Sequence, residues 1–267
     1  MLFLTLAANL AFSGRAQPVS GAALDEPPVD AVRNYLPVSF NNVTPSSYGL
    51  VSGVIIDAVT GVKQAGVSVC VLNVHCVLAD LNGKFYLSNV PTTGLQTLTV
   101  TPDPGLYSFY SQLIQVSNST PLYVVVSLSS TNLSQGWVRI VLTWGNEGDL
   151  DANLLFGSTR IYYGNKGDCS VACLQSDSNT YGPETITVSS GVTDLIKFAV
   201  ARQGSEHEIT YYNALVQVYD NTGLLESFST PSSGIGSVWY VFDMAWNAGT
   251  NHYDITKQDQ LLNGLPH

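Results

Sequence analysis

The chain has 267 residues, a formal net charge of −10 at pH 7 and only 11% charged residues. Its ten Lys and Arg residues are scattered singly, so no basic surface is available to neutralise phosphates, and nucleic acid is excluded as a partner class. The length is enough for two domains of ordinary size, each able to bury its own core.

Residues 1–16 begin with an apolar run followed by Gly14 and Ala16, two small residues at the spacing that a signal peptidase favours. This pattern predicts secretion to the extracellular space or the cell surface. A basic start is missing, which leaves open an apolar N-terminal strand that stays in the mature protein. The run is shorter than the roughly 20 residues that a membrane helix needs, and no later segment reads as a span.

Residues 17–47 are rich in proline and lack hydrophobic periodicity, which indicates an extended leader. From residue 48 to residue 130, short β-branched runs alternate with the turn dipeptides Thr60-Gly61, Ala65-Gly66 and Asn82-Gly83. No window of a dozen residues has a helical period. We therefore expect an all-β fold, with a first β-sandwich over residues 48–130.

The polar stretch STNLSQG at residues 130–136 predicts a domain boundary. Seven or eight further strand-like runs follow, and their spacing predicts a second β-sandwich over residues 135–247, of jelly-roll or immunoglobulin-like type. Trp144 and Trp239 lie at the ends of apolar runs, and we expect both in its core. Residues 248–267 read as a polar tail that is partly ordered at most.

The first predicted domain resembles the carboxypeptidase regulatory-like domain. The resemblance depends on GVIID at 53–57, TG at 60–61, AGVSV at 65–69, ADLNGKF at 79–85 and VP at 90–91. It implies a transthyretin-like, seven-stranded sandwich. Members of that family are usually accessory modules for attachment, spacing or assembly rather than catalysts.

The second predicted domain is similar to a YfaP-type domain of unknown function from secreted and surface proteins. The matching segments are VRIVLTW at 138–144, DLDANL at 149–154, YYGN at 162–165, YGPETI at 181–186, VQVY at 216–219 and GSVWYVF at 236–242. The resemblance implies location and fold rather than an activity. Relatives often have an acidic run before the Tyr-Gly-Pro-Glu turn, whereas this chain keeps Asp177 between two serines.

Four cysteines form two close pairs, and an even count in an exported chain indicates two local disulfides. We expect Cys70 to pair with Cys76 across a hairpin centred near Asn73, and Cys169 to pair with Cys173. The spacing of the second pair is near that of zinc ligands, but the chain has only four histidines and none forms a paired motif with it.

Three tripeptides match the acceptor pattern for N-linked glycans in polar, turn-like contexts. They place candidate glycans on Asn42, Asn118 and Asn132. Such tripeptides also occur by chance in a chain rich in Asn, Ser and Thr, so they add modest support for export.

An unusual concentration of acids follows Trp144 in the segment WGNEGDLDANLLFG. On a strand, Asp149, Asp151 and Asn153 share one face and the intervening apolar residues share the other. Positions two apart are separated by about 6.5–7 Å, whereas Ca²⁺ ligands lie about 2.3–2.6 Å from the ion, so a bend is needed to bring them together. Asp177 and Glu184 could add oxygens, which makes these five residues a candidate Ca²⁺ site.

Several other uses of these residues stay open from sequence. The acids could accept hydrogen bonds from loop N–H groups without any metal, or Asp151 and Glu184 could act as the carboxylate pair of a glycosidase. A third possibility is a sugar-stacking or protein-binding platform of aromatic residues. Its members would be Tyr162, Tyr163, Tyr181, Tyr211, Tyr212 and Trp246.

The function expected from these features is non-enzymatic adhesion or self-assembly, with other copies of the chain or an extracellular protein or glycan as partner. The alternative is a carbohydrate-binding module or a glycoside-active enzyme.

Overall fold

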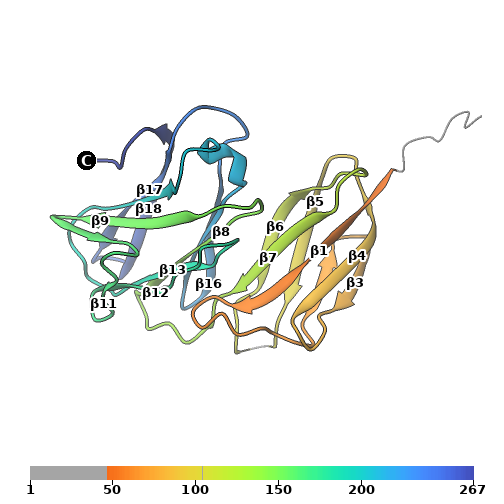
Figure 1. Cartoon of the computed structure of the whole chain (residues 1–267). Coiled ribbons are helices and arrows are strands. Elements are labelled where there is room, and N and C mark those ends of the chain that lie inside the picture. The colour runs from red at the N-terminus through yellow and green to blue at the C-terminus, as the bar shows by residue number, and fades with distance from the viewer. Residues whose placement is uncertain (1–46, 104) are drawn as a thin grey trace, which may run out of the picture. The chain divides into compact units, whose positions relative to one another are not determined.

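The computed structural model describes residues 47–103 and 105–267. The predicted apolar N-terminus, almost all of the proline-rich leader and the sequon at Asn42 lie outside these residues. Within them the chain is almost entirely β, and the helical element η1 is a short 3-10 turn, Ile209–Tyr212. In this part of the chain no helix is long and apolar enough to cross a membrane. The strands form two tandem β-sandwiches, which confirms the predicted fold class (Figure 1).

The first sandwich has the seven strands expected of a transthyretin-like domain. One sheet has the order β4-β1-β7, formed by Lys84–Pro91, Tyr48–Asp57 and Leu122–Leu128. The facing sheet has the order β3-β2-β5-β6, formed by His75–Leu78, Ser68–Val71, Leu95–Thr101 and Tyr110–Gln115. Only β1 and β7 run parallel among these pairs.

Alternation of apolar and polar residues explains how these strands pack. In β4, Phe85 and Leu87 are buried while Lys84 and Tyr86 are exposed. Inward-facing residues of both sheets, including Val69 and Leu98 from the second, meet in one core. Burying each such side chain stabilises the fold by about 1.5–3 kcal/mol. The alternating pattern therefore accounts for much of the free energy that holds the two sheets together.

The turns of this domain follow the predicted dipeptides. The φ angle of Gly83 is 71°, and an added Cβ there would lie 2.6 Å from the carbonyl oxygen of Ile55, so this position requires glycine. The β2–β3 hairpin turns at Asn73, which has a φ of 63°. Cys70 and Cys76 are opposite each other in this hairpin and form the predicted disulfide.

The second sandwich is larger. Its first sheet has the order β10-β9-β14-β17-β18, formed by Thr159–Ile161, Leu150–Phe156, Ile196–Arg202, Val238–Asn247 and His252–Leu262. Its second sheet has the order β11-β12-β13-β8-β15-β16, formed by Gly167–Asp168, Ala172–Ser176, Glu184–Val188, Val138–Thr143, Leu215–Asp220 and Gly223–Ser229. All pairs in these sheets are antiparallel.

Both tryptophans predicted for the core of this sandwich are buried there. The indole N–H of Trp144 donates to the carbonyl of Gly148 at 2.9 Å, and that of Trp239 donates to Asp259 Oδ1 at 2.9 Å. Each indole therefore buries its apolar ring without leaving its polar atom unpaired.

The expectation of a poorly ordered tail is wrong. Residues from His252 to Leu262 form β18, which pairs along its length with β17. Its Tyr253 is buried, and the Tyr253 hydroxyl donates to the carbonyl of Ser189 at 2.6 Å. The polar appearance of this segment arises because β18 is an edge strand, with one face in contact with the core and the other in solvent.

The segment between β7 and β8 contains the predicted boundary and is held by a buried arginine. Arg139 Nη1 donates to Ser129 Oγ at 3.1 Å and to the carbonyl of Ser130 at 3.2 Å. Thr185 of β13 donates through its hydroxyl to the carbonyl of Ala58, which lies just after β1. The polar linker is therefore tied to β8, and a separate hydrogen bond joins β13 to the residue after β1.

Candidate functional site

A bend before β9 positions the acidic residues. The backbone bends over residues 145–148, as the two glycines in this stretch predicted. Gly148 has a φ of 133°, and an added Cβ there would lie 2.2 Å from Tyr212 Cε1. Glycine is required at this position, and it delivers Asp149 to the start of the strand.

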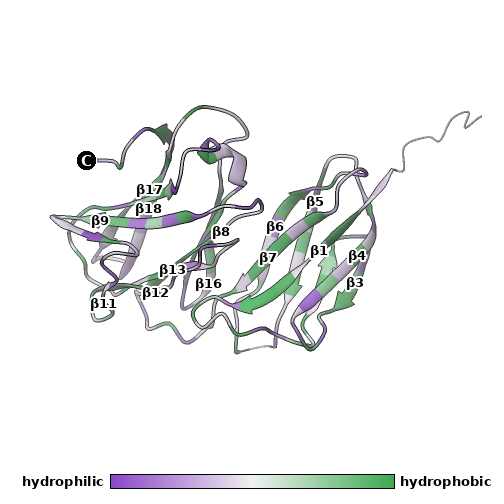
Figure 2. Ribbon diagram, in the orientation of Figure 1, coloured by the Kyte–Doolittle hydropathy of each residue, from purple (hydrophilic) through white to green (hydrophobic). Residues whose placement is uncertain are grey.

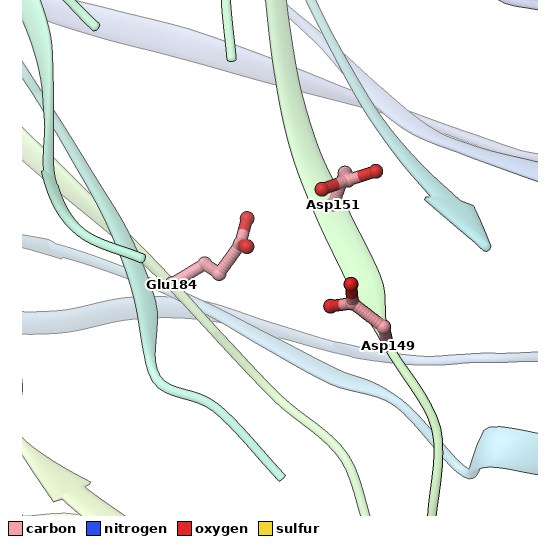
Figure 3. Close-up of side chains that lie close together, drawn as sticks. All are labelled: Asp149, Asp151 and Glu184. Atoms are coloured by element: carbon pink, nitrogen blue, oxygen red, sulfur yellow. The ribbon is translucent and has the colours of Figure 1, made fainter. Parts of the chain in front are cut away.

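Three carboxylates converge at this end of the sandwich. One oxygen from each of Asp149, Asp151 and Glu184 lies within 4.8 Å of the other two. Figure 3 shows the side chain of Glu184 extending from a different strand toward Asp149 and Asp151. Asp151 belongs to β9 and Glu184 is the first residue of β13, so the group joins the two sheets.

The predicted alternation along β9 is confirmed. Leu150, Ala152 and Leu154 belong to the hydrophobic core, and the polar residues between them point to the other side. Figure 2 shows this change of hydropathy along the strand. Because the sheets meet near this end, Asp151 is buried even though it faces away from the core.

Glu184 is the most deeply buried of the three acids, with 1% of its surface exposed. Its Oε2 accepts a hydrogen bond from the N–H of Ala152 at 2.6 Å, while Oε1 has no hydrogen-bond partner. Burial raises the pKa of Glu184 to about 9; the Ala152 bond opposes this, and the neighbouring aspartates add to it. A half-paired buried carboxylate of this kind is costly unless a proton or a cation accompanies it.

The two aspartates are perturbed in the same direction. Burial raises the pKa of Asp151 to about 6, against a hydrogen bond that its Oδ2 accepts from the side-chain amide of Gln203. Burial and the charge of Asp177 raise the pKa of Asp149. Mutual repulsion and desolvation therefore both disfavour three ionised carboxylates in this place.

Two other predicted ligands lie differently. Asn153 does not join the group, because its Oδ1 accepts from Arg160 Nε at 2.9 Å and Nη2 at 2.7 Å, and its amide donates to the carbonyl of Asp151 at 3.0 Å. Asp177 pairs with Lys166 at 2.8 Å. Its charge still raises the pKa of Glu184, so it belongs to the surroundings of the site.

Sequence reasoning missed two partners of this site. Gln203 directly follows β14 and is 52 positions from Asp151, to which its side chain donates a hydrogen bond. Lys166 directly precedes β11 and pairs with Asp177. Neither residue belongs to a local motif. Only the pairing of β14 with β9, which places Arg202 opposite Leu150, could have indicated that Gln203 is close.

A surface cavity of ≈530 Å³ lies beside the acidic group. It is lined by Glu147, Gly148, Gln203, Gly204, Ser205, Glu206, His207, Tyr211 and Tyr212. Asp151 and Glu184 do not line it, so a sugar in this cavity would not contact the carboxylate pair considered for hydrolysis.

The aromatic residues considered for a stacking platform do not form one surface. Tyr162 packs on Tyr163, Tyr211 packs on Tyr212, and Tyr181 packs on Tyr123. Trp246 packs on Tyr253 at 5.0 Å between ring centroids. These aromatic residues therefore form separate pairs. Of the pairs, only Tyr211 with Tyr212 lines the ≈530 Å³ cavity.

The remaining predicted residues lie away from this site. Cys169 and Cys173 form the second disulfide, which rules out zinc binding by these thiols. Asn118 and Asn132 are exposed in loops that flank β7, where a glycan could be accommodated. Glycosylation at these positions stays a prediction.

No protein-family model and no curated protein sequence matches the chain. Among solved structures, a homologue of the telluride resistance protein from Streptomyces coelicolor is similar at 13% identity and a TM-score of 0.41, covering 50% of this chain and 94% of that chain. The major pilin subunit of Bacillus cereus is similar at 10% identity and a TM-score of 0.26, covering 68% and 67%. A candidate carbohydrate-binding protein from Bacteroides uniformis is similar at 9% identity and a TM-score of 0.25, covering 68% and 97%.

Likenesses this weak transfer neither activity nor partners. The resemblances to the carboxypeptidase regulatory-like and YfaP-type domains likewise stay predictions, since no family model matches.

Proposed function

We propose that this chain is a secreted, non-enzymatic protein of the cell surface or extracellular space that acts by adhesion or self-assembly. The observation that carries the proposal is the outer face of the β3-β2-β5-β6 sheet. Its four strands contain no Asp, Glu, Lys or Arg residue. A sheet face in solvent usually carries charges that oppose association.

The strand register identifies the side chains on this face. Thr97 is opposite Leu113, Thr99 is opposite Ser111, and Ser68 is flanked by Leu78 and Thr101. Leu78 is 69% exposed and Leu113 is 62% exposed. Exposed leucines among short hydroxyl side chains form a surface that is easily desolvated.

A second copy of the chain is the partner that this face fits best. The chain carries a net charge of −10, and its first sandwich contributes little of it, since residues 48–130 hold only Asp57, Asp80, Asp103, Lys63 and Lys84 as charged groups. The charge of this sandwich therefore adds little repulsion to a contact between two copies. The same contact with other parts of the chain would bring like charges together.

The absence of catalysis is part of the proposal. Glu184 is buried to 1% exposure and Asp151 is hydrogen-bonded to Gln203, so neither carboxylate is presented to a glycosidic bond. Glycan binding is the second candidate, supported by the cavity with Tyr211 and Glu206 on its wall. A glycan array with a parallel hydrolysis assay separates these candidates from assembly.

The test of assembly is sedimentation velocity of the full chain as a function of concentration, with electron microscopy of the same samples. We expect self-association that Leu78→Glu combined with Leu113→Glu abolishes, because the new carboxylates would face each other across the contact. Ile235→Glu, at an exposed position of the second sandwich, is the matched control. A chain that stays monomeric at high concentration, or a double variant that associates like the wild type, contradicts the proposal.

A further inference from the structure

A buried oxygen without a partner marks the acidic group as more than a cluster of like charges. Glu184 Oε1 lies inside the sandwich with no hydrogen-bond donor near it, and Figure 3 shows the carboxylate aimed toward Asp149 and Asp151. A buried acceptor left unpaired costs about 1–3 kcal/mol, and more when it is charged. Something that the protein atoms do not supply is therefore expected beside this oxygen.

We propose that Asp149, Asp151 and Glu184 bind one Ca²⁺ ion, which links the start of β9 to the start of β13. The site is independent of the assembly face in the first sandwich.

The spacing of the oxygens fits a single ion. Two ligands that each lie about 2.3–2.6 Å from Ca²⁺ can be separated by about 5.2 Å at most. The three carboxylate oxygens lie within 4.8 Å of one another, which is inside that limit. An ion among them would also pair with the free Oε1 of Glu184 and cancel the repulsion among the acids.

The chemistry of the donors selects a hard cation. All three ligands are carboxylates, and no described cysteine is free to add a thiolate, since all four are held in disulfides. Oxygen-only sites favour Ca²⁺, Mg²⁺ or Mn²⁺ over zinc and copper. Ca²⁺ tolerates irregular geometry and 6–8 ligands, which suits three carboxylates on two different sheets completed by water.

The charges around the site are consistent with cation binding. Asp177 adds a fourth negative group close enough to raise the pKa of both Asp151 and Glu184. Arg160 binds Asn153 and its charge lowers the pKa of Asp151, while Lys166 pairs with Asp177. Within the described residues no salt bridge is formed by Asp149, Asp151 or Glu184, so no protein cation takes the place of the ion.

The acidic group is open to solvent at Asp149, which is partly exposed, whereas Asp151 and Glu184 are buried behind it. The ≈530 Å³ surface cavity reaches Gly148 and Gln203, the neighbours of Asp149 and Asp151, but not the acids themselves. An ion would therefore approach the group past Asp149.

The test uses the full chain after removal of metals with a chelator. Isothermal titration with Ca²⁺ is expected to show one site, and Ca²⁺ is expected to raise the melting temperature by several degrees, because a ligand that binds only the folded state stabilises it. Tb³⁺ is a second probe. Trp144 hydrogen-bonds to Gly148 next to Asp149, so excitation of Trp144 should sensitise Tb³⁺ emission.

The decisive variant is Glu184→Gln, with Glu226→Gln as a matched control at an exposed position of β16. We expect Glu184→Gln to weaken Ca²⁺ binding at least tenfold, because it changes the buried carboxylate whose Oε1 is left for the ion. Asp149→Asn, at a partly exposed position, should also weaken binding. The control should bind like the wild type.

Three results overturn the proposal. The first is a chelated wild type that shows neither heat nor a melting shift with millimolar Ca²⁺. The second is Glu184→Gln that binds Ca²⁺ as tightly as the wild type. The third is binding of Mg²⁺ with no response to Ca²⁺, which would leave a cation site of a different selectivity.

Discussion

The two sandwiches of this chain differ in how many charged residues they contain and in where those residues lie. The first has few ionisable groups and exposes most of the large apolar side chains seen on the molecule's surface, among them Leu78, Leu81 and Leu113. The second carries most of the acids and brings three of them together, two of which are buried. This difference is the basis of the two proposals, in which the neutral surface makes contacts and the acidic group binds a cation.

The largest expected effect comes from a substitution in the core of the first sandwich, which tests whether the two cores unfold independently. Phe85 is buried in the first sandwich at 1% exposure, and Phe85→Ala should destabilise that sandwich by about 3–5 kcal/mol. Urea unfolding measures the loss. Tb³⁺ emission from the second sandwich should persist until urea reaches the concentration that unfolds the second sandwich. If the emission is lost together with the first sandwich, the two sandwiches do not unfold independently.

A smaller effect is expected at the bend before β9. Gly148→Ala forces a Cβ into Tyr212 and strains a backbone with a φ of 133°, so we expect a loss of about 1–3 kcal/mol. The displaced Asp149 should also weaken Ca²⁺ binding. Gly191→Ala, at a positive φ with nothing near the added Cβ, is the control for backbone strain alone. Equal Ca²⁺ binding in both variants would contradict the role given to the bend.

The two sandwiches should also respond to pH with opposite signs. The pKa of Glu184 is raised from 4.5 to about 9 by burial, so its contribution to folding is fully present below pH 4.5 and is lost as the pH rises toward 9. In chelator, the melting temperature of the second sandwich should therefore fall across this window. Glu184→Gln should flatten that dependence, and an unchanged slope in the variant would assign it to other groups.

The smallest effect lies in the first sandwich at acid pH. Burial would raise the pKa of Asp57, but hydrogen bonds from the N–H groups of Thr60 and Val59 outweigh it and lower the pKa below 3.8. Its contribution is present above pH 3.8 and is lost as the pH falls through the lowered value. Asp57→Asn should reduce this acid sensitivity, as measured by melting between pH 2 and pH 5. A variant with wild-type acid sensitivity would refute the role of Asp57.

Much of this architecture could be predicted from local sequence. Alternation identified the buried side of β4 and β9, and dipeptides such as Asn82-Gly83 identified turns because those positions need a positive φ. Close cysteine spacing identified both disulfides. Each of these features depends on residues within a few positions of one another.

Features that depend on distant residues could not be predicted in this way. The tail was misjudged because β18 is ordered by its pairing with β17, although its own sequence is polar. Asn153 shares a face with Asp151 but is drawn away by Arg160 from β10, a contact that alternation does not reveal. Glu184 was a candidate as a further oxygen donor from the next long loop, but its unpaired oxygen became visible only with the two sheets in place.

Hydrogen exchange of the full chain, compared with and without Ca²⁺, tests the division between the two sandwiches most directly. We predict added protection at the start of β9, at the start of β13 and in the loop around Asp177, with no change in β1 to β7. Protection that is unchanged everywhere, or that appears chiefly in the first sandwich, would contradict this account.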